Sequence, residues 1–368
     1  MTVATTERLF NFSAGPAVLP LPVLQQVQQE LLCLPGAGAS ILEISHRGPA
    51  FEPILAEAQA NLKKLLGVGD DWQVLFLQGG ATTQFSMVPM NFLTAGKTAD
   101  YILCGAWSKK AIAEARKVGA VNVVWDGAAE KFTRMPRQSE LRATSGAAYL
   151  HTTSNETIEG VCFDYDPDLG EVPVVCDTSS DFLSRPLDMS RYSFIYAGAQ
   201  KNVGPAGCTL VVARKEFLAR AGGEKLPVML EYKTHVDNDS MYNTPPTFAI
   251  YVINLVLRWL LNDVGGLEAM HKRNFEKSKL LYSAIDGSDG YYRGHARSDS
   301  RSLMNVTFRL PSEELEKKFA KEAEARKLDG LKGHRSVGGM RASIYNAFPI
   351  EGVQALVAFM DEFRKANG

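Results

Sequence analysis

Short apolar runs alternate with helical segments between residues 20 and 260, and few folds accommodate that order. The runs are brief and continuous, as is typical of strands buried on both faces of a sheet. They cover residues 74–77, 101–104, 148–150, 172–176, 194–196 and 209–212. The segments between them include residues 22–34 and 53–66, whose apolar side chains recur at helical spacing. The order predicts an α/β fold whose mostly parallel sheet is flanked by helices.

The most apolar stretch of the chain covers residues 248–261. A bilayer span needs about 20 apolar residues, and this stretch is shorter and is interrupted by Asn254 and Arg258. We therefore expect a buried helix and no membrane partner. Residues 1–10 contain no long apolar run either, so we expect no secretory signal and a cytoplasmic location.

The pattern changes at the Asp263-Val264-Gly265-Gly266 turn. Beyond it, the spacing predicts helices at 267–285, 312–327 and 352–364 and strands at 304–310 and 340–345. A chain of 368 residues is long enough for two domains of about 100–200 residues each. We predict a large domain over residues 18–263 and a smaller α+β domain formed by residues 1–17 and 264–368.

Composition excludes several classes of partner. The formal net charge of −1 argues against nucleic-acid binding, which normally accompanies a strong basic surplus. An anionic ligand must instead be held by a local cluster of residues. The five cysteines are scattered and include no C-x-x-C pair, so neither a disulfide framework nor a metal site is expected.

The carboxyl ends of strands in open α/β sheets are where ligands bind. Here the first predicted strand leads into Gly79-Gly80-Ala81-Thr82 ahead of a helix. Backbone N–H groups at such a helix start can hold a phosphate. Taken alone, the motif fits better with a glycine turn followed by a threonine N-cap.

Three further strand ends carry Trp107, Asp177 and Lys201. A tryptophan there can stack on a flat ring, although most tryptophans only fill a core. A carboxylate after a buried strand needs a partner, and a helix N-cap is the alternative for Asp177. Lys201 lies among small residues, where desolvation would lower the pKa of its amine; most lysines are instead solvated. Together these features fit pyridoxal 5'-phosphate, a planar phosphorylated cofactor that bonds to an amine and needs an acid at its ring nitrogen.

Five sequence runs identify the chain as similar to a known family. They are Asn11 to Ala17, Ser45-His46-Arg47, Asn155 to Ile158, Ala199 to Asn202 and Gly333 to Ser343. With them the chain resembles the class V aminotransferases of fold-type I over nearly its whole length. The resemblance implies a seven-stranded large domain, a pyridoxal-phosphate cofactor, and a homodimer with shared active sites.

The resemblance also implies roles for matching residues. Lys201 would form the imine to the cofactor, Asp177 would pair with the ring nitrogen, and Trp107 would stack on the ring. Thr157 would hydrogen-bond the ring hydroxyl. The cofactor phosphate would be bound by Ala81, Thr82 and Gln200, and by Asn243 and Thr244 of the second chain.

The substrate pocket implied by the resemblance is rich in arginine and histidine. Arg341 would bind the substrate α-carboxylate. His46, Arg47, His334 and Arg335 would surround a substrate phosphate, some of them contributed by the second chain. Two His-Arg pairs in a near-neutral protein independently favour a pocket for a dianion. One branch of the family has Gly-Arg in place of Ala81-Thr82, and the phosphate contact made by that arginine is absent here.

The reaction that the resemblance implies is transfer of an amino group between glutamate and 3-phosphohydroxypyruvate, giving O-phosphoserine and 2-oxoglutarate in serine biosynthesis. A related role in vitamin B6 biosynthesis is left open. Alternatives are an alanine–glyoxylate or serine–pyruvate aminotransferase, a cysteine desulfurase that would use Cys208, and a binding protein without catalysis.

Overall fold

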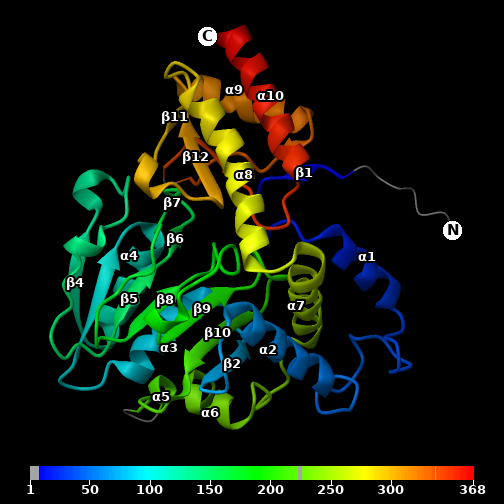
Figure 1. The fold of residues 1–368 in the computed structure, drawn as a ribbon, viewed down its shortest axis with the longest axis vertical. Helices are drawn as coiled ribbons and strands as arrows, with labels where there is room; N and C mark the ends of the chain where they lie inside the picture. Colours follow the sequence, from blue (N-terminus) through cyan, green and yellow to red (C-terminus); the bar gives the residue numbers. More distant parts are fainter. Residues whose placement is uncertain (1–7, 223–225, 336) are drawn as a thin grey trace.

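The computed structural model describes residues 8–222, 226–335 and 337–368. A large unit built on a seven-stranded sheet carries a smaller unit at one end, with the C-terminal helix at the far tip (Figure 1). The strand order of the sheet is β2-β10-β9-β8-β5-β3-β4. Its neighbouring strands run parallel, apart from β10, which is antiparallel to both β2 and β9. The predicted mostly parallel, seven-stranded sheet is confirmed.

The six predicted strands are present, with bounds shifted by a few residues. The sheet strands are β2 (Trp72–Leu77), β3 (Thr98–Leu103), β4 (Ala120–Asp126), β5 (Leu150–Thr153), β8 (Val174–Asp177), β9 (Phe194–Gly198) and β10 (Thr209–Arg214). The edge strand β4 was not predicted. Its residues are exposed or half-buried, so it lacks the continuous apolar run that marks the central strands.

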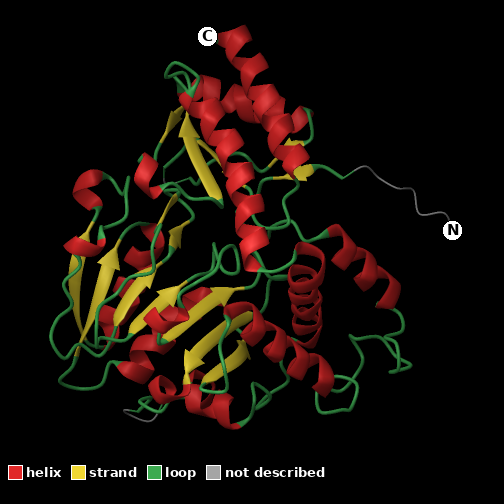
Figure 2. Cartoon of the chain, viewed as in Figure 1, coloured by secondary structure: helices red, strands yellow, loops and turns green. Residues whose placement is uncertain are grey.

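Helices cover both faces of the sheet (Figure 2). Alternate residues of β2 show this, because Val74 and Phe76 share a core with α2 and α7 whereas Leu75 and Leu77 share another with α3 and α4. The helices of the large unit are α1 (Leu21–Glu30), α2 (Glu52–Leu66), α3 (Gly80–Phe92), α4 (Ala106–Val118), α5 (Lys215–Leu218), α6 (Tyr232–Asp237) and α7 (Thr247–Trp259). Single turns of 3-10 helix lie at Ala128–Glu130, Gln138–Glu140, Met189–Arg191, Val228–Leu230 and Ser298–Ser300.

Helix α7 is the buried helix expected from the most apolar stretch, and a π-helical turn at Leu260–Val264 extends it. By length and composition residues 247–264 could cross a bilayer, but 61% of them are buried in this fold. Their polar interruptions have partners on α2. Asn254 Nδ2 donates to Glu57 Oε2 at 2.9 Å, and Arg258 Nε donates to Glu57 Oε1 at 2.7 Å.

The smaller unit packs three helices on a three-stranded antiparallel sheet, ordered β11-β12-β14. Its elements are α8 (Leu267–Asp286), β11 (Arg293–Gly294), β12 (Asn305–Arg309), α9 (Glu313–Ala325), β13 (Leu328–Asp329), β14 (Met340–Ser343) and α10 (Ile350–Asn367). Strand β1 (Phe10–Asn11) pairs with β13, and Phe12 shares the core of this unit. The predicted division into a large domain of residues 18–263 and a smaller domain of residues 1–17 and 264–368 remains our proposal. Residues 1–7 lie outside the described residues. The first turns of α8 pack in the large core, since Leu267 and Met270 belong to it.

Candidate active site

A cavity of about 290 Å³ lies where β8 and β9 end, against the start of α3. The cavity joins residues that are far apart in the sequence: Ala81 lies in α3 of the large unit, and Arg341 lies in β14 of the smaller unit. Its lining includes nine of the residues singled out in the sequence: Ala81, Thr82, Trp107, Thr157, Asp177, Gln200, Lys201, His334 and Arg341. The strand-end prediction therefore identified a real cavity, while the role of each residue stays a proposal.

The Lys201 side chain enters this cavity from the turn that follows β9. Its Nζ donates a hydrogen bond to Thr157 Oγ1 at 2.8 Å and lies 5.6 Å from the centroid of the Trp107 ring. Burial lowers the pKa of the Lys201 amine to about 8, and the nearby Asp177 carboxylate only partly opposes that shift. A buried amine with this pKa is available in its neutral form near physiological pH.

Asp177 is the last residue of β8 and is only 4% exposed. Its Oδ1 accepts the Ser179 N–H at 2.9 Å, and no helix begins there, so the alternative of a helix N-cap is wrong. Burial raises the pKa of the Asp177 carboxyl, whereas Ser179 and Lys201 act in the opposite direction. A carboxylate placed this way is stabilised by a cationic ligand atom in the cavity.

The start of α3 forms another wall of the cavity. Gly79 occupies the N-cap position with φ of 93°, and Gly80 follows with φ of 69°. No side chain caps this helix, so the alternative of a threonine N-cap is wrong; Thr83 Oγ1 instead donates to the Gly79 carbonyl at 2.8 Å. The N–H groups of the first turn lack intrahelical partners and favour an anion such as phosphate.

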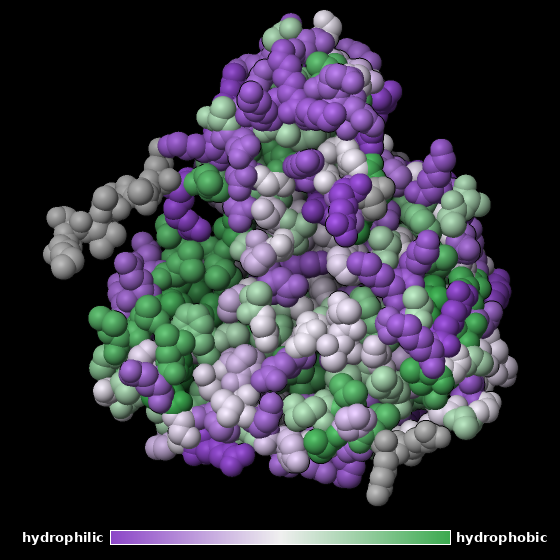
Figure 3. Space-filling model, turned by 180° about the vertical axis from the view of Figure 1, so that it is seen from behind, coloured by the Kyte–Doolittle hydropathy of each residue, from purple (hydrophilic) through white to green (hydrophobic). Residues whose placement is uncertain are grey.

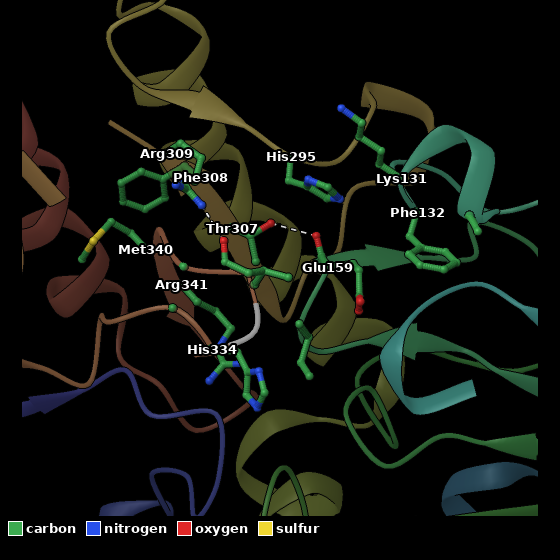
Figure 4. A pocket seen from close by; sticks show the side chains of 15 residues that line it. Lys131, Phe132, Glu159, His295, Thr307, Phe308, Arg309, His334, Met340 and Arg341 are labelled. Atoms are coloured by element: carbon green, nitrogen blue, oxygen red, sulfur yellow. Dashed lines mark hydrogen bonds between the residues drawn. The ribbon is translucent and has the colours of Figure 1, made fainter. Parts of the chain in front are cut away.

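Arg341 and His334 separate this cavity from a second one of about 520 Å³. In Figure 4 both side chains lie below the second cavity, with Lys131 and Phe132 of the large unit opposite Arg309 and Met340 of the smaller unit. Burial, followed by the charges of Arg341 and Arg335, lowers the pKa of His334. His334 is therefore neutral at pH 7, while Arg341 keeps its charge because an arginine titrates far above that pH.

Five predicted residues lie outside the cavity of this single chain: His46, Arg47, Asn243, Thr244 and Arg335. Gln78 Nε2 donates to the Thr244 carbonyl at 3.0 Å, which places the loop holding Asn243 and Thr244 next to the start of α3. The structure also adds cavity residues that the sequence reasoning did not assign, among them Thr153, Ser179 and Ser180. Thr153 ends β5, three residues beyond the predicted end of that strand at Leu150, so the strand-end argument did not reach it.

Comparison with known proteins identifies the family. The family model described as Aminotransferase class-V matches residues 9–356, and the chain belongs to the class V aminotransferases. Within that class, its relatives include phosphoserine aminotransferases that are 51% to 56% identical to it. The one from Rhodopirellula baltica is 56% identical over 98% of this chain and 96% of its own length.

Solved structures agree with that placement. Phosphoserine aminotransferase from Bacillus circulans subsp. alkalophilus superposes with a TM-score of 0.96 at 52% identity, over 99% of this chain and 100% of that one. The pyridoxal-phosphate-bound phosphoserine aminotransferase from Trichomonas vaginalis has a TM-score of 0.91 at 40% identity, over 96% of this chain and 100% of that one. The predicted fold-type I architecture is confirmed.

The cavity fits pyridoxal phosphate, the cofactor of this family. In the described part of the chain, Trp107 Nε1, Thr153 Oγ1 and Asn155 Oδ1 are buried polar atoms without a hydrogen-bond partner, and all three residues line the cavity. Buried polar groups are normally paired, so these atoms indicate a polar ligand. The uncapped start of α3 offers N–H groups that suit a phosphate, and the buried Asp177 carboxyl in the same lining suits a ring nitrogen.

Proposed function

We propose that this chain is a cytoplasmic aminotransferase that moves the amino group of glutamate to 3-phosphohydroxypyruvate, yielding 2-oxoglutarate and O-phosphoserine for serine biosynthesis. The main support is one cavity that joins a lysine of lowered pKa, a buried acid and an arginine: Lys201, Asp177 and Arg341. The chain belongs to the class V aminotransferases, and its similarity to phosphoserine aminotransferases supports the choice of substrates.

Each of these residues has a chemical task. Pyridoxal phosphate, when bound, supplies an electron-withdrawing ring and carries the amino group between the two substrates. The neutral Nζ of Lys201 takes the proton from the α-carbon of the amino donor, and in the second half-reaction the protonated Nζ gives a proton to the α-carbon of the new amino acid. The Asp177 carboxylate favours a protonated ring nitrogen, and the Arg341 guanidinium holds the carboxylate that both substrates share.

The substrate phosphate requires residues that one chain does not bring to the cavity. We propose a homodimer in which His46, Arg47, Asn243 and Thr244 of one chain complete the site of the other. Figure 3 shows apolar side chains gathered on the flank of α1 and the loop after it, where Leu32 is 87% and Leu42 63% exposed. An apolar surface of this kind supports association with a second chain.

A complementation experiment tests the shared sites. Chains carrying Lys201→Ala and chains carrying Arg47→Ala are purified separately, unfolded, mixed and refolded. A hybrid dimer would contain one site with both wild-type residues, so a random mixture should recover about a quarter of wild-type activity. Failure to exceed the sum of the two separate variants would argue against sharing of Arg47.

The reaction itself is tested by competition. Purified protein with glutamate receives 3-phosphohydroxypyruvate, pyruvate and glyoxylate together, and the amino-acid products are measured by mass spectrometry. O-phosphoserine should dominate, whereas a dominance of alanine or glycine would assign the chain to the alternative aminotransferases. The desulfurase alternative has no structural support, because Cys208 is 1% exposed and burial raises the pKa of its thiol.

A further inference from the structure

Two buried carboxylates clamp the start of helix α4. They come from the 155–162 hairpin, in which β6 (Asn155–Glu156) pairs with β7 (Val161–Cys162). Glu156 Oε2 accepts the Trp107 N–H at 2.9 Å, and its Oε1 accepts the Ser108 N–H at 2.8 Å. Glu159 Oε1 accepts the Ala106 N–H at 3.0 Å. Three N–H groups of the first turn of α4 are thus satisfied from a distant segment.

The clamp is built by close packing as well as by hydrogen bonds. Glu156 is 0% and Glu159 6% exposed. A Cβ on Gly105 would lie 2.5 Å from Glu156 Cδ and 2.7 Å from Glu159 Oε2, far inside normal contact distances. Gly105 has φ of 172°, which any residue adopts, so space and not backbone conformation requires a glycine there.

The same hairpin also determines the positions of two residues that line the cofactor cavity, Thr157 and Trp107. Thr157, between the two glutamates in the sequence, accepts the hydrogen bond from Lys201 Nζ. Trp107 is a residue of the first turn of α4, which the two glutamates hold. The hairpin is itself held by the smaller unit, because Thr307 Oγ1 donates to the Glu159 carbonyl at 2.8 Å (Figure 4). One short segment therefore determines where Trp107 and Thr157 lie relative to Lys201.

We propose that Glu156, assisted by Glu159, is a positioning residue that sets the Trp107 ring against the cofactor. This rests on the cofactor part of the proposed function but not on its substrates. Burial raises the pKa of Glu156, and the hydrogen bonds from the Ser108 and Trp107 N–H groups act in the opposite direction. In its ionised form the carboxylate accepts from both N–H groups and interacts favourably with the positive end of the α4 dipole. Burial and then the charge of Glu156 raise the pKa of Glu159 to about 8, so Glu159 holds a proton at pH 7.

The test replaces the carboxylate without changing its size. In Glu156→Gln one carboxylate oxygen becomes an NH₂ group. The side chain then loses its hydrogen bond from either the Trp107 N–H or the Ser108 N–H, and the NH₂ group faces that N–H, donor against donor. We expect the dissociation constant of pyridoxal phosphate from the cofactor-free protein to rise about tenfold or more, as loss of a buried charge-assisted hydrogen bond implies. The induced circular dichroism of the bound ring should fall as well.

Two matched variants serve as controls. Glu114 lies on the same helix, is half-buried, and among the described residues pairs with Lys117 and Ser86, away from the cavity lining, so Glu114→Gln should not change the cofactor affinity. Glu159→Gln keeps the oxygen that accepts the Ala106 N–H and resembles the protonated acid, so its effect should stay within about threefold. Equal affinity and equal dichroism in Glu156→Gln and wild type would overturn the proposal.

Two more measurements test the proposal even if Glu156→Gln does not fold. Gly105→Ala forces the Glu156 carboxylate aside by another route and should give the same loss of affinity. In the wild-type cofactor-free protein, the Trp107 and Ser108 amides should exchange slowly with solvent, although amides in a first helical turn usually lack partners. Rapid exchange of both amides would also overturn the proposal. None of these readouts depends on which amino acceptor the enzyme prefers.

Discussion

The lowered pKa of Lys201 predicts a selective chemical reaction of the cofactor-free protein. With a pKa of about 8, roughly a tenth of the Lys201 amine is neutral at pH 7, against roughly 0.03% for a lysine with the ordinary value of 10.5. The neutral amine is the reactive form, so the ratio of neutral fractions is about 300. A lower intrinsic nucleophilicity reduces that advantage, and a rate ratio of at least about tenfold remains.

Brief reductive methylation of the cofactor-free protein between pH 6 and 9 measures this selectivity, with peptide mass spectrometry as the readout. Modification of Lys201 should rise with a midpoint near pH 8. Lys233 on α6 serves as the exposed reference because its side chain is 75% exposed.

Lys277 separates pKa from accessibility in the same experiment. Burial lowers its pKa to about 7, yet the residue is 3% exposed and donates to carbonyls of the β14–α10 turn, among them Tyr345 O at 2.6 Å. It does not line the cofactor cavity, so it should stay unmodified while Lys201 reacts. The reasoning is refuted if Lys201 reacts no faster than Lys233 at pH 7, or if Lys277 reacts as fast as Lys201.

Three further predictions concern activity and stability. Asp177→Asn should fold normally, by circular dichroism, but lose kcat by orders of magnitude because the ring nitrogen loses its acid partner; near-normal kcat would remove that role. Arg335→Ala should raise KM for 3-phosphohydroxypyruvate much more than for glutamate, and equal changes would argue against phosphate binding. Phe319→Ala should lower the free energy of unfolding by about 3–5 kcal/mol, because the ring is 0% exposed and lies 4.7 Å from that of Phe359. Urea denaturation checks this, and a loss below about 1 kcal/mol would contradict the packing argument.

The fold could be predicted where burial leaves a local signal. Central strands such as β8, apart from its last residue Asp177, and β9 are apolar because both faces of the sheet are covered. The helix predicted over residues 53–66 ends at Gly67, which has the left-handed conformation typical of such caps, with φ of 65°. The direction of β10 was not predictable, since its apolar run is the same whether it pairs parallel or antiparallel. The two-residue strands β6 and β7 depend on tertiary contacts and leave no periodic pattern.

The same distinction applies to the site. Trp107, Asp177 and Lys201 could be located because each lies at or shortly after the end of a strand of the sheet, and the topology brings those ends together. Glu156 and Glu159 were not assigned a role, because a glutamate in a loop is normally solvated and only the fold shows these two to be buried. Arg335 and His46 could be associated with the site by resemblance alone, because neither residue lines the cavity of this chain.

Helix α8 passes as one continuous rod from the core of the large unit to that of the smaller unit. Its first turns contribute Met270 to the former and its last turns contribute Leu281 to the latter. At its base, Gly265 and Gly266 have φ of 92° and 95°, a conformation that glycine adopts without the steric cost of a Cβ. Its 20 residues span about 30 Å, so a tilt of about 5° at that base moves the tip by about 2.6 Å. Because α8 packs in both cores, the angle at which it leaves the large unit sets the position of the far end of the smaller unit.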